Sequence, residues 1–108
     1  MGRTVLLCLI ALLWPNRAYG GPIYGSIFHD GRALTRASIT IACAGGSTPG
    51  STLDDGSYRV NVPQTGRCTF TVAVPGGAAR TEVVSSSGAV MYNFAVVKGN
   101  AGYELRRQ

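Results

Sequence analysis

The chain has 108 residues, a formal net charge of +5, only five acidic residues and one histidine. This length suits one small domain and excludes two. Nine of the ten basic residues are arginines scattered along the chain without interleaved aromatic residues, which argues against a nucleic-acid-binding protein.

Residues 1–20 have the pattern of a secretory signal peptide. A basic tip precedes an apolar run over residues 5–14, and the pattern Ala-Tyr-Gly follows at residues 18–20. The apolar run is about ten residues long, half of what a membrane-spanning helix needs. We therefore expect cleavage after Gly20, with cleavage after Ala18 as the alternative, and a secreted or periplasmic protein without a transmembrane segment.

Removal of residues 1–20 leaves 88 residues with eight basic and five acidic side chains. Two cysteines remain, Cys43 and Cys68. In an oxidising compartment, an even pair in a small domain predicts a disulfide bond. The closed loop of about 26 residues would stabilise the fold by roughly 3 to 4 kcal/mol on a chain-entropy estimate.

From residue 21 onward, alternating apolar and polar residues are interrupted about every ten residues by Gly, Pro, Asn, Asp or Ser, the pattern of short strands. Strands are predicted at residues 23–29, 37–43, 57–62, 67–74, 78–84 and 89–98, with a short strand at 52–53 and a loop at 44–51. The sequence therefore predicts an all-β fold, an antiparallel β-sandwich of six or seven strands.

Alternation also predicts which side chains face the core, because successive residues of a strand point to opposite faces. The expected inward-facing residues are Ile39, Ile41, Cys43, Tyr58, Val60, Val62, Cys68, Phe70, Val72, Val74, Tyr92, Phe94 and Val96. Both cysteines belong to this set, which suits a buried bridge.

The acidic pair Asp54 and Asp55 precedes Gly56, between the short strand and the strand that carries Tyr58. Asp-Gly is a strong hairpin-turn dipeptide because glycine tolerates positive φ. A weak calcium site is the alternative, but a calcium loop needs more oxygen ligands at defined spacing. We interpret Asp54, Asp55, Gly56 and Tyr58 as structural residues of the turn and predict no metal site.

Several spacings match one family pattern in order along the chain. They are Gly25 in the first strand, Gly31 and Ala37 around the next turn, the Thr-x-Asp-x-Gly-x-Tyr hairpin of residues 52–58, and Pro63 and Gly66 before the next strand. Residues 22–77 thus resemble the carboxypeptidase regulatory-like domain. The resemblance implies a transthyretin-like, Greek-key sandwich over residues 21–108 and a stand-alone, non-catalytic module. Cys68-Thr69-Phe70 departs from the family pattern and indicates a secreted, disulfide-bearing form.

Catalytic chemistry has little support in the sequence. The single histidine, His29, lies at a predicted strand end beside Asp30, and no Gly-x-Ser-x-Gly motif is present. Once the cysteines pair, His29 and scattered carboxylates do not make a catalytic metal site. We expect no enzymatic activity and no cofactor.

Three arginines, Arg59, Arg67 and Arg80, fall on outward-facing or strand-start positions. They would form a possible binding face for anionic glycans; a solvated face is the alternative. We expect a module that binds or scaffolds a protein partner in the envelope or extracellular space. The alternative is a carbohydrate-binding module for cell-surface or anionic glycans.

Overall fold

The computed structural model describes residues 20–100 and 102–108. The predicted signal peptide, apart from Gly20, lies outside the described residues. The strands are β1 (Pro22–His29), β2 (Arg32–Ala33), β3 (Ser38–Cys43), β4 (Gly46–Ser51), β5 (Ser57–Asn61), β6 (Gly66–Val74), β7 (Gly77–Ser85), β8 (Val90–Met91), β9 (Phe94–Gly99) and β10 (Gly102–Arg107). None of the described residues forms a helix long and apolar enough to cross a bilayer.

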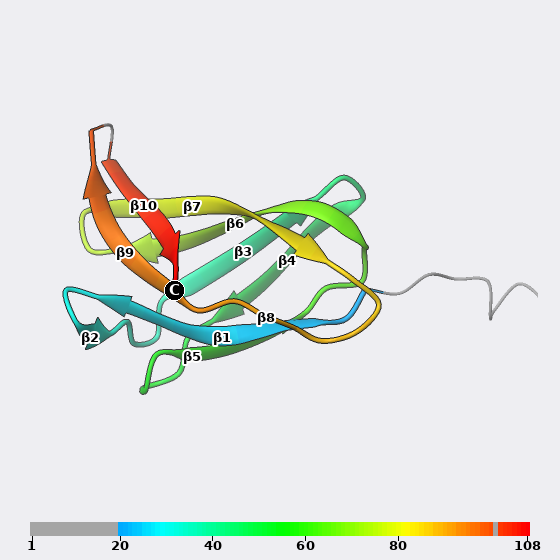
Figure 1. Ribbon diagram of the computed structural model, residues 1–108, viewed down its shortest axis with the longest axis horizontal. Helices are drawn as coiled ribbons and strands as arrows, with labels where there is room; N and C mark the ends of the chain where they lie inside the picture. The colour runs from blue at the N-terminus through cyan, green and yellow to red at the C-terminus, as the bar shows by residue number, and fades with distance from the viewer. Residues whose placement is uncertain (1–19, 101) are drawn as a thin grey trace, which may run out of the picture.

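The ten strands form one curled, mixed sheet (Figure 1). The strand order is β2-β1-β9-β10-β7-β6-β3-β4, and β5 and β8 also pair with β1. Strand β1 runs parallel to β8 and β9, and β7 runs parallel to β10. In Figure 1, β1, β5 and β8 lie along the lower side and β6 and β7 along the upper side, with β3 and β4 between them. The sheet thus has the shape of half a barrel.

The all-β class is confirmed, but the predicted sheet arrangement is wrong. Residues 20–100 and 102–108 form ten strands rather than six or seven, and all ten belong to one mixed, hydrogen-bonded network instead of two stacked antiparallel sheets. Strand β4 occupies the predicted loop, and β10 covers a segment without a predicted strand. The side chains of β4 are exposed or half-buried, so its sequence lacks apolar alternation. The sequence pattern does not distinguish parallel from antiparallel pairing, because side chains alternate between the two faces in both kinds of strand.

The two ends of the curled sheet, β4 and β5, meet at Gly50 and Val60. A side-chain carbon built on Gly50 would lie 2.5 Å from a methyl group of Val60. Among the described strands, no ladder joins β4 to β5. Strands β4 and β5, on the two opposing walls of the half-barrel, therefore contact each other through side-chain packing and not through backbone hydrogen bonds.

The concave face holds the core, and the predicted inward-facing residues are confirmed there. All of them are buried except Cys43, which is half-buried and packs against the cluster. Phe70 of β6 is fully buried and contacts the ring of Tyr58 at 5.2 Å and that of Phe94 at 5.0 Å between centroids. Because β5 and β9 lie far from β6 in the strand order, these rings join opposite walls.

The predicted disulfide between Cys43 and Cys68 is confirmed. The two residues lie directly opposite each other in the antiparallel pair of β3 and β6, with a Cα–Cα distance of 4.3 Å. The bond therefore joins two neighbouring strands at the end where the chain leaves β3 for β4.

Tyr58 takes part in a buried polar network. Its hydroxyl donates a 2.7 Å hydrogen bond to the carbonyl of Tyr92, and the Tyr92 hydroxyl accepts one of 2.9 Å from the amide of Val84. The Arg107 guanidinium lies 4.6 Å from the centroid of the Tyr92 ring. Burial raises the pKa of the Tyr58 hydroxyl above its ordinary value, and the neighbouring Tyr92 raises it further.

Replacing both Cys43 and Cys68 by alanine is expected to lower the free energy of unfolding by roughly 3 kcal/mol, because the unfolded chain regains its loop entropy. Urea denaturation of the oxidised wild type and the double variant measures this. Reduction should shift the midpoint of the wild type and leave that of the variant unchanged. Equal midpoints for the oxidised wild type and the variant would contradict the expectation.

Tyr58→Phe is expected to cost about 1 kcal/mol at pH 8, because the Tyr92 carbonyl loses its buried donor. The raised pKa means that the unfolded chain releases the Tyr58 proton first. The contribution of Tyr58 is therefore complete below about pH 10 and declines above it. The stability of the wild type should fall more steeply than that of the variant between pH 8 and 11 in urea titrations. Tyr24→Phe, at a half-buried position on β1, is the control, and parallel pH profiles for wild type and Tyr58→Phe would refute the assignment.

Candidate functional site

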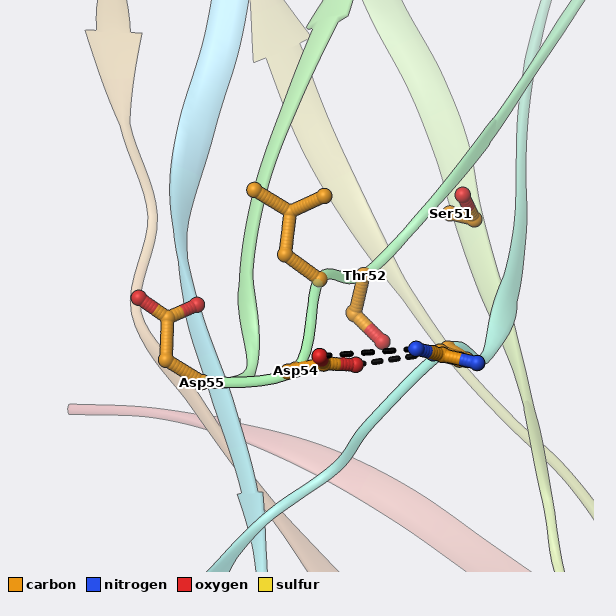
Figure 2. Close-up of a pocket in the computed structure, with 6 residues that line it drawn as sticks. Ser51, Thr52, Asp54 and Asp55 are labelled. Atoms are coloured by element: carbon orange, nitrogen blue, oxygen red, sulfur yellow. Dashed lines mark hydrogen bonds and ion pairs between the residues drawn. The ribbon is translucent and has the colours of Figure 1, made fainter.

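The acidic pair lies in the connection between β4 and β5. Arg36 and residues 51–55 line a shallow surface hollow there (Figure 2). The amide of Leu53 donates to the carbonyl of Ser57, and the amide of Gly56 donates to the carbonyl of Leu53. The backbone therefore closes a tight turn around the two carboxylates.

Asp54 forms an ion pair with Arg36. The Arg36 Nε donates to Oδ1 at 2.7 Å, and Nη2 lies 3.5 Å from Oδ2. Both side chains are largely exposed, so the pair contributes little to stability. Its effect is local, because the guanidinium neutralises the charge of Asp54 at the edge of the hollow.

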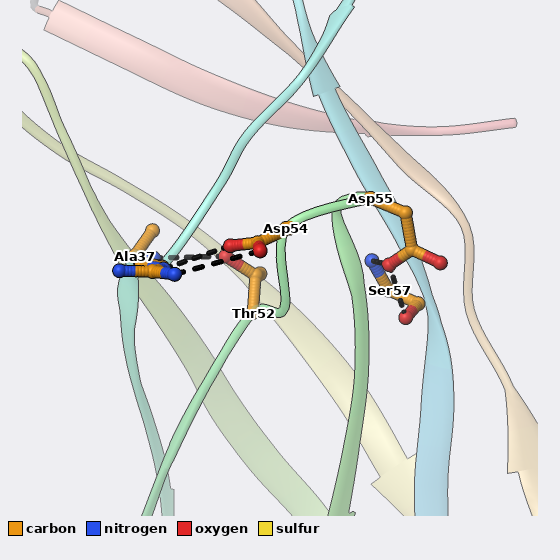
Figure 3. A network of polar contacts seen from close by, with 6 residues as sticks. Ala37, Thr52, Asp54, Asp55 and Ser57 are labelled. Atoms are coloured by element: carbon orange, nitrogen blue, oxygen red, sulfur yellow. Dashed lines mark hydrogen bonds and ion pairs between the residues drawn. The ribbon is translucent and has the colours of Figure 1, made fainter.

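Thr52 joins this turn to the start of β3 (Figure 3). Its Oγ1 accepts a 2.8 Å hydrogen bond from the amide of Ala37, and its own amide donates to the carbonyl of Ala37 at 2.9 Å. Thr52 is only 2% exposed. This reciprocal pair of bonds positions Asp54 beside Arg36.

Asp55 stabilises the opposite side of the turn. Its Oδ1 accepts from the Ser57 hydroxyl at 2.6 Å and from the Ser57 amide at 3.0 Å (Figure 3). These bonds, the hydroxyl's first, lower the pKa of the Asp55 carboxyl. Within residues 20–100 and 102–108, no three His, Cys, Asp or Glu side chains are grouped as a metal site would require. The geometry favours the turn interpretation of Asp54 and Asp55.

The three arginines of the predicted basic face do not gather in one place. Arg67 on β6 and Arg80 on β7 are exposed on the same two-stranded surface, where they lie opposite Val84 and Thr71. Arg59 is on β5, which β1, β9 and β10 separate from β7 in the strand order. Two of the three residues thus share a face.

His29 ends β1 beside the turn to β2. Its Nε2 lies 3.8 Å from a carboxylate oxygen of Asp30, and its ring meets that of Tyr103 edge-on at 5.6 Å. His29 also lines a second hollow with Leu34, Thr35 and other residues of the segments 33–38 and 73–75. The imidazole is therefore partly covered by neighbouring side chains.

Sequence reasoning missed Arg36 as the partner of Asp54. Eighteen positions separate the two residues, so no local pattern connects them. The Ser57 contact was within reach, because Asp-x-Ser is a typical pattern for a side chain that bonds to the backbone two residues later.

No protein-family model matches this sequence, and no curated protein is significantly similar to it. A solved structure of a DUF3823 family protein from Parabacteroides merdae is similar, with a TM-score of 0.55 and 14% sequence identity. The alignment covers 83% of this chain and 47% of that one, so this chain spans about half the length of its structural relative. This likeness shows the fold alone. The resemblance to the carboxypeptidase regulatory-like domain stays a prediction.

Gly56→Val is expected to destabilise the protein by more than about 2 kcal/mol, because a β-branched residue is strained at positive φ. Gly56 has a φ of 83°, and a side-chain carbon would lie 2.8 Å from the carbonyl oxygen of Ile27. Gly88→Val is the matched control, because nothing lies within 4 Å of a side-chain carbon there. Thermal and urea denaturation compare the two variants, and equal effects would refute the turn requirement.

Proposed function

We propose that this chain is an exported, non-catalytic β-module that binds or scaffolds a protein partner in the envelope or extracellular space. The observation that carries the proposal is the outer face, defined as the side chains of three neighbouring strands that point away from the core. They are Ser38, Thr40 and Ala42 of β3, Arg67, Thr69, Thr71 and Ala73 of β6, and Ala78, Arg80, Glu82 and Val84 of β7.

The outer face consists mainly of short side chains in register. Thr40, Thr71 and Arg80 lie in one row across the three strands, and Ala42 and Thr69 lie opposite each other in the next. Ala, Ser and Thr lose little rotamer freedom on binding. The hydrogen-bonded strands beneath these side chains already fix the backbone, so less conformational entropy is lost when a partner binds. A partner surface of complementary shape can therefore pack closely here.

The charges of the outer face favour a protein over a polyanion. Arg67 and Arg80 stand with Glu82 on the same face, so the signs are mixed. Val84 is 52% exposed and adds an apolar contact. Mixed signs disfavour a polyanion, and arginine is enriched in protein interfaces.

Export is supported by the leader pattern of residues 1–20 together with the disulfide, which persists in oxidising compartments. A distant relationship to the carboxypeptidase regulatory-like domain is part of the proposal. It is supported by its hairpin motif, in which Thr52 and Asp54 position the turn, Gly56 adopts positive φ and Tyr58 is buried. Members of that family act as modules that bind or space, so the absence of catalysis is proposed here as well.

A carbohydrate-binding function is the second candidate. A shallow hollow is lined by Ala78, Arg80, Gly102, Tyr103 and Glu104. It combines a half-buried aromatic ring with a cation and a carboxylate, the groups that stack on and hydrogen-bond to a sugar ring. Arg80 belongs to both surfaces.

A photo-crosslinking amino acid at Thr40 tests the protein-binding proposal in the exported full chain. We expect a discrete cross-linked product with an envelope or extracellular protein from Thr40, and none from Asn61, which is exposed on β5. Arg80→Glu should weaken that product severalfold, since it reverses a charge within the row.

Equal cross-linking from Thr40 and Asn61, or none from either, would overturn the proposal. Glycan-array binding that Tyr103→Ala abolishes would favour the carbohydrate function instead. Turnover of glycosidase, esterase or peptidase substrates that disappears in His29→Ala would overturn the non-catalytic assignment.

A further inference from the structure

Gly20 and Gly21, where the chain enters β1, are bound into one end of the half-barrel. The amide of Gly20 donates to the carbonyl of Pro63 at 2.9 Å, and the carbonyl of Gly21 accepts from the amide of Val62 at 3.2 Å. Gly21 is buried. Pairing of β1 with β5 begins directly afterwards, where Pro22 lies opposite Asn61. The bond to the Gly21 carbonyl and the pairing of β1 with β5 fix the position of Gly21, and neither involves Gly20.

Oxygen atoms crowd this pair of glycines. A side-chain carbon built on Gly20 would overlap the carbonyl oxygens of Val62 and Gln64 and lie 2.9 Å from Ser85 Oγ. A side-chain carbon on Gly21 would overlap the carbonyl oxygen of Gly88. Carbonyl oxygens can only accept hydrogen bonds, so the site is rich in acceptors.

One of these oxygens lacks a partner. Ser85 is 2% exposed, and its Oγ makes no hydrogen bond within the described part of the chain. A buried hydroxyl without a partner is costly, and native structures rarely keep one unless a further group satisfies it. Because the neighbouring carbonyl oxygens can only accept, a donor placed among them would also give Ser85 Oγ a partner.

We propose that hydrolysis of the Gly20–Gly21 peptide bond supplies that donor, and that the resulting α-ammonium of Gly21 occupies this site as the partner of Ser85 Oγ. Water is the co-reactant of the cleaving peptidase. The bond between the Gly20 carbonyl carbon and the Gly21 nitrogen breaks, the carboxylate leaves with residues 1–20, and the nitrogen becomes an ammonium. This inference rests on the export proposed above.

The geometry suits an ammonium at this point. The Gly21 nitrogen is two covalent bonds from the Gly20 Cα, a separation of about 2.4 Å. The nitrogen therefore lies within a few ångströms of the oxygens that a side-chain carbon on Gly20 would meet. Three N–H donors with a full positive charge match a group of acceptors, and charge-assisted hydrogen bonds are the stronger kind. Cleavage after Ala18 instead would leave Gly20 in place and the ammonium two residues away.

The test uses protein exported from the full-length sequence, without any binding partner. Intact mass should place the N-terminus at Gly21. The processed chain then holds two amines, the α-amine and Lys98, since the sequence has one lysine. Lys98 is exposed and serves as the internal standard.

Amine acetylation at pH 7, followed by peptide mass mapping, measures both amines. In denaturant the α-amine should react first, because its pKa is lower than that of lysine. In the folded protein we expect its rate, relative to Lys98, to fall by roughly tenfold or more, because the ammonium is held by hydrogen bonds. Ser85→Ala should restore much of the rate, whereas Ser87→Ala, at an exposed position, should not.

An N-terminus other than Gly21 would overturn the inference. An α-amine that reacts in the folded protein at its denatured rate would do the same, as would equal effects of Ser85→Ala and Ser87→Ala. None of these outcomes touches partner binding at the outer face. Conversely, a failed cross-linking experiment with a protected α-amine would refute only the proposed function.

Discussion

The fold depends on the contact of Phe70 with Tyr58 and Phe94, because these rings bring opposite walls of one curled sheet together. A sheet with one apolar face must cover that face, and here the sheet covers itself by bending. Phe70 has no exposed surface, so its ring fills the centre of the concave side of the sheet. The Tyr58 hydroxyl donates to the Tyr92 carbonyl, and both residues are hydrogen-bonded neighbours of β1. This bond therefore fixes the arrangement of the strands on one side of the core.

The surface features follow from this curvature. Curling brings β4 back beside β5, and Gly50 permits the close approach of Val60. The short connection between these two strands then holds Thr52 against Ala37 and Asp54 beside Arg36. The convex side of β3, β6 and β7 stays exposed, because most of its side chains are short or polar and offer little apolar surface to cover. The disulfide joins two of these three strands and restrains that side.

The two proposals concern separate parts of the molecule and separate steps. The outer face is proposed to bind a partner protein. The oxygen-rich site at Gly20 and Gly21 is proposed to bind the α-ammonium that cleavage of the leader creates. The outer face is an ordered surface that is exposed, whereas the site at Gly20 and Gly21 holds the buried Ser85 hydroxyl, which has no hydrogen-bond partner among the described residues.

The sequence by itself determined the all-β class, the positions of most strands, their inward-facing residues and the cysteine pair. It also placed the turn at Gly56. These properties are local, since alternation and turn chemistry act within a few residues. Only the tertiary structure decided the parallel pairing of β1 with β9 and of β7 with β10, the edge strand β4, and the partnership of Arg36 with Asp54. Each of these joins segments whose local patterns are compatible with several neighbours, and the burial of one common core selects among them.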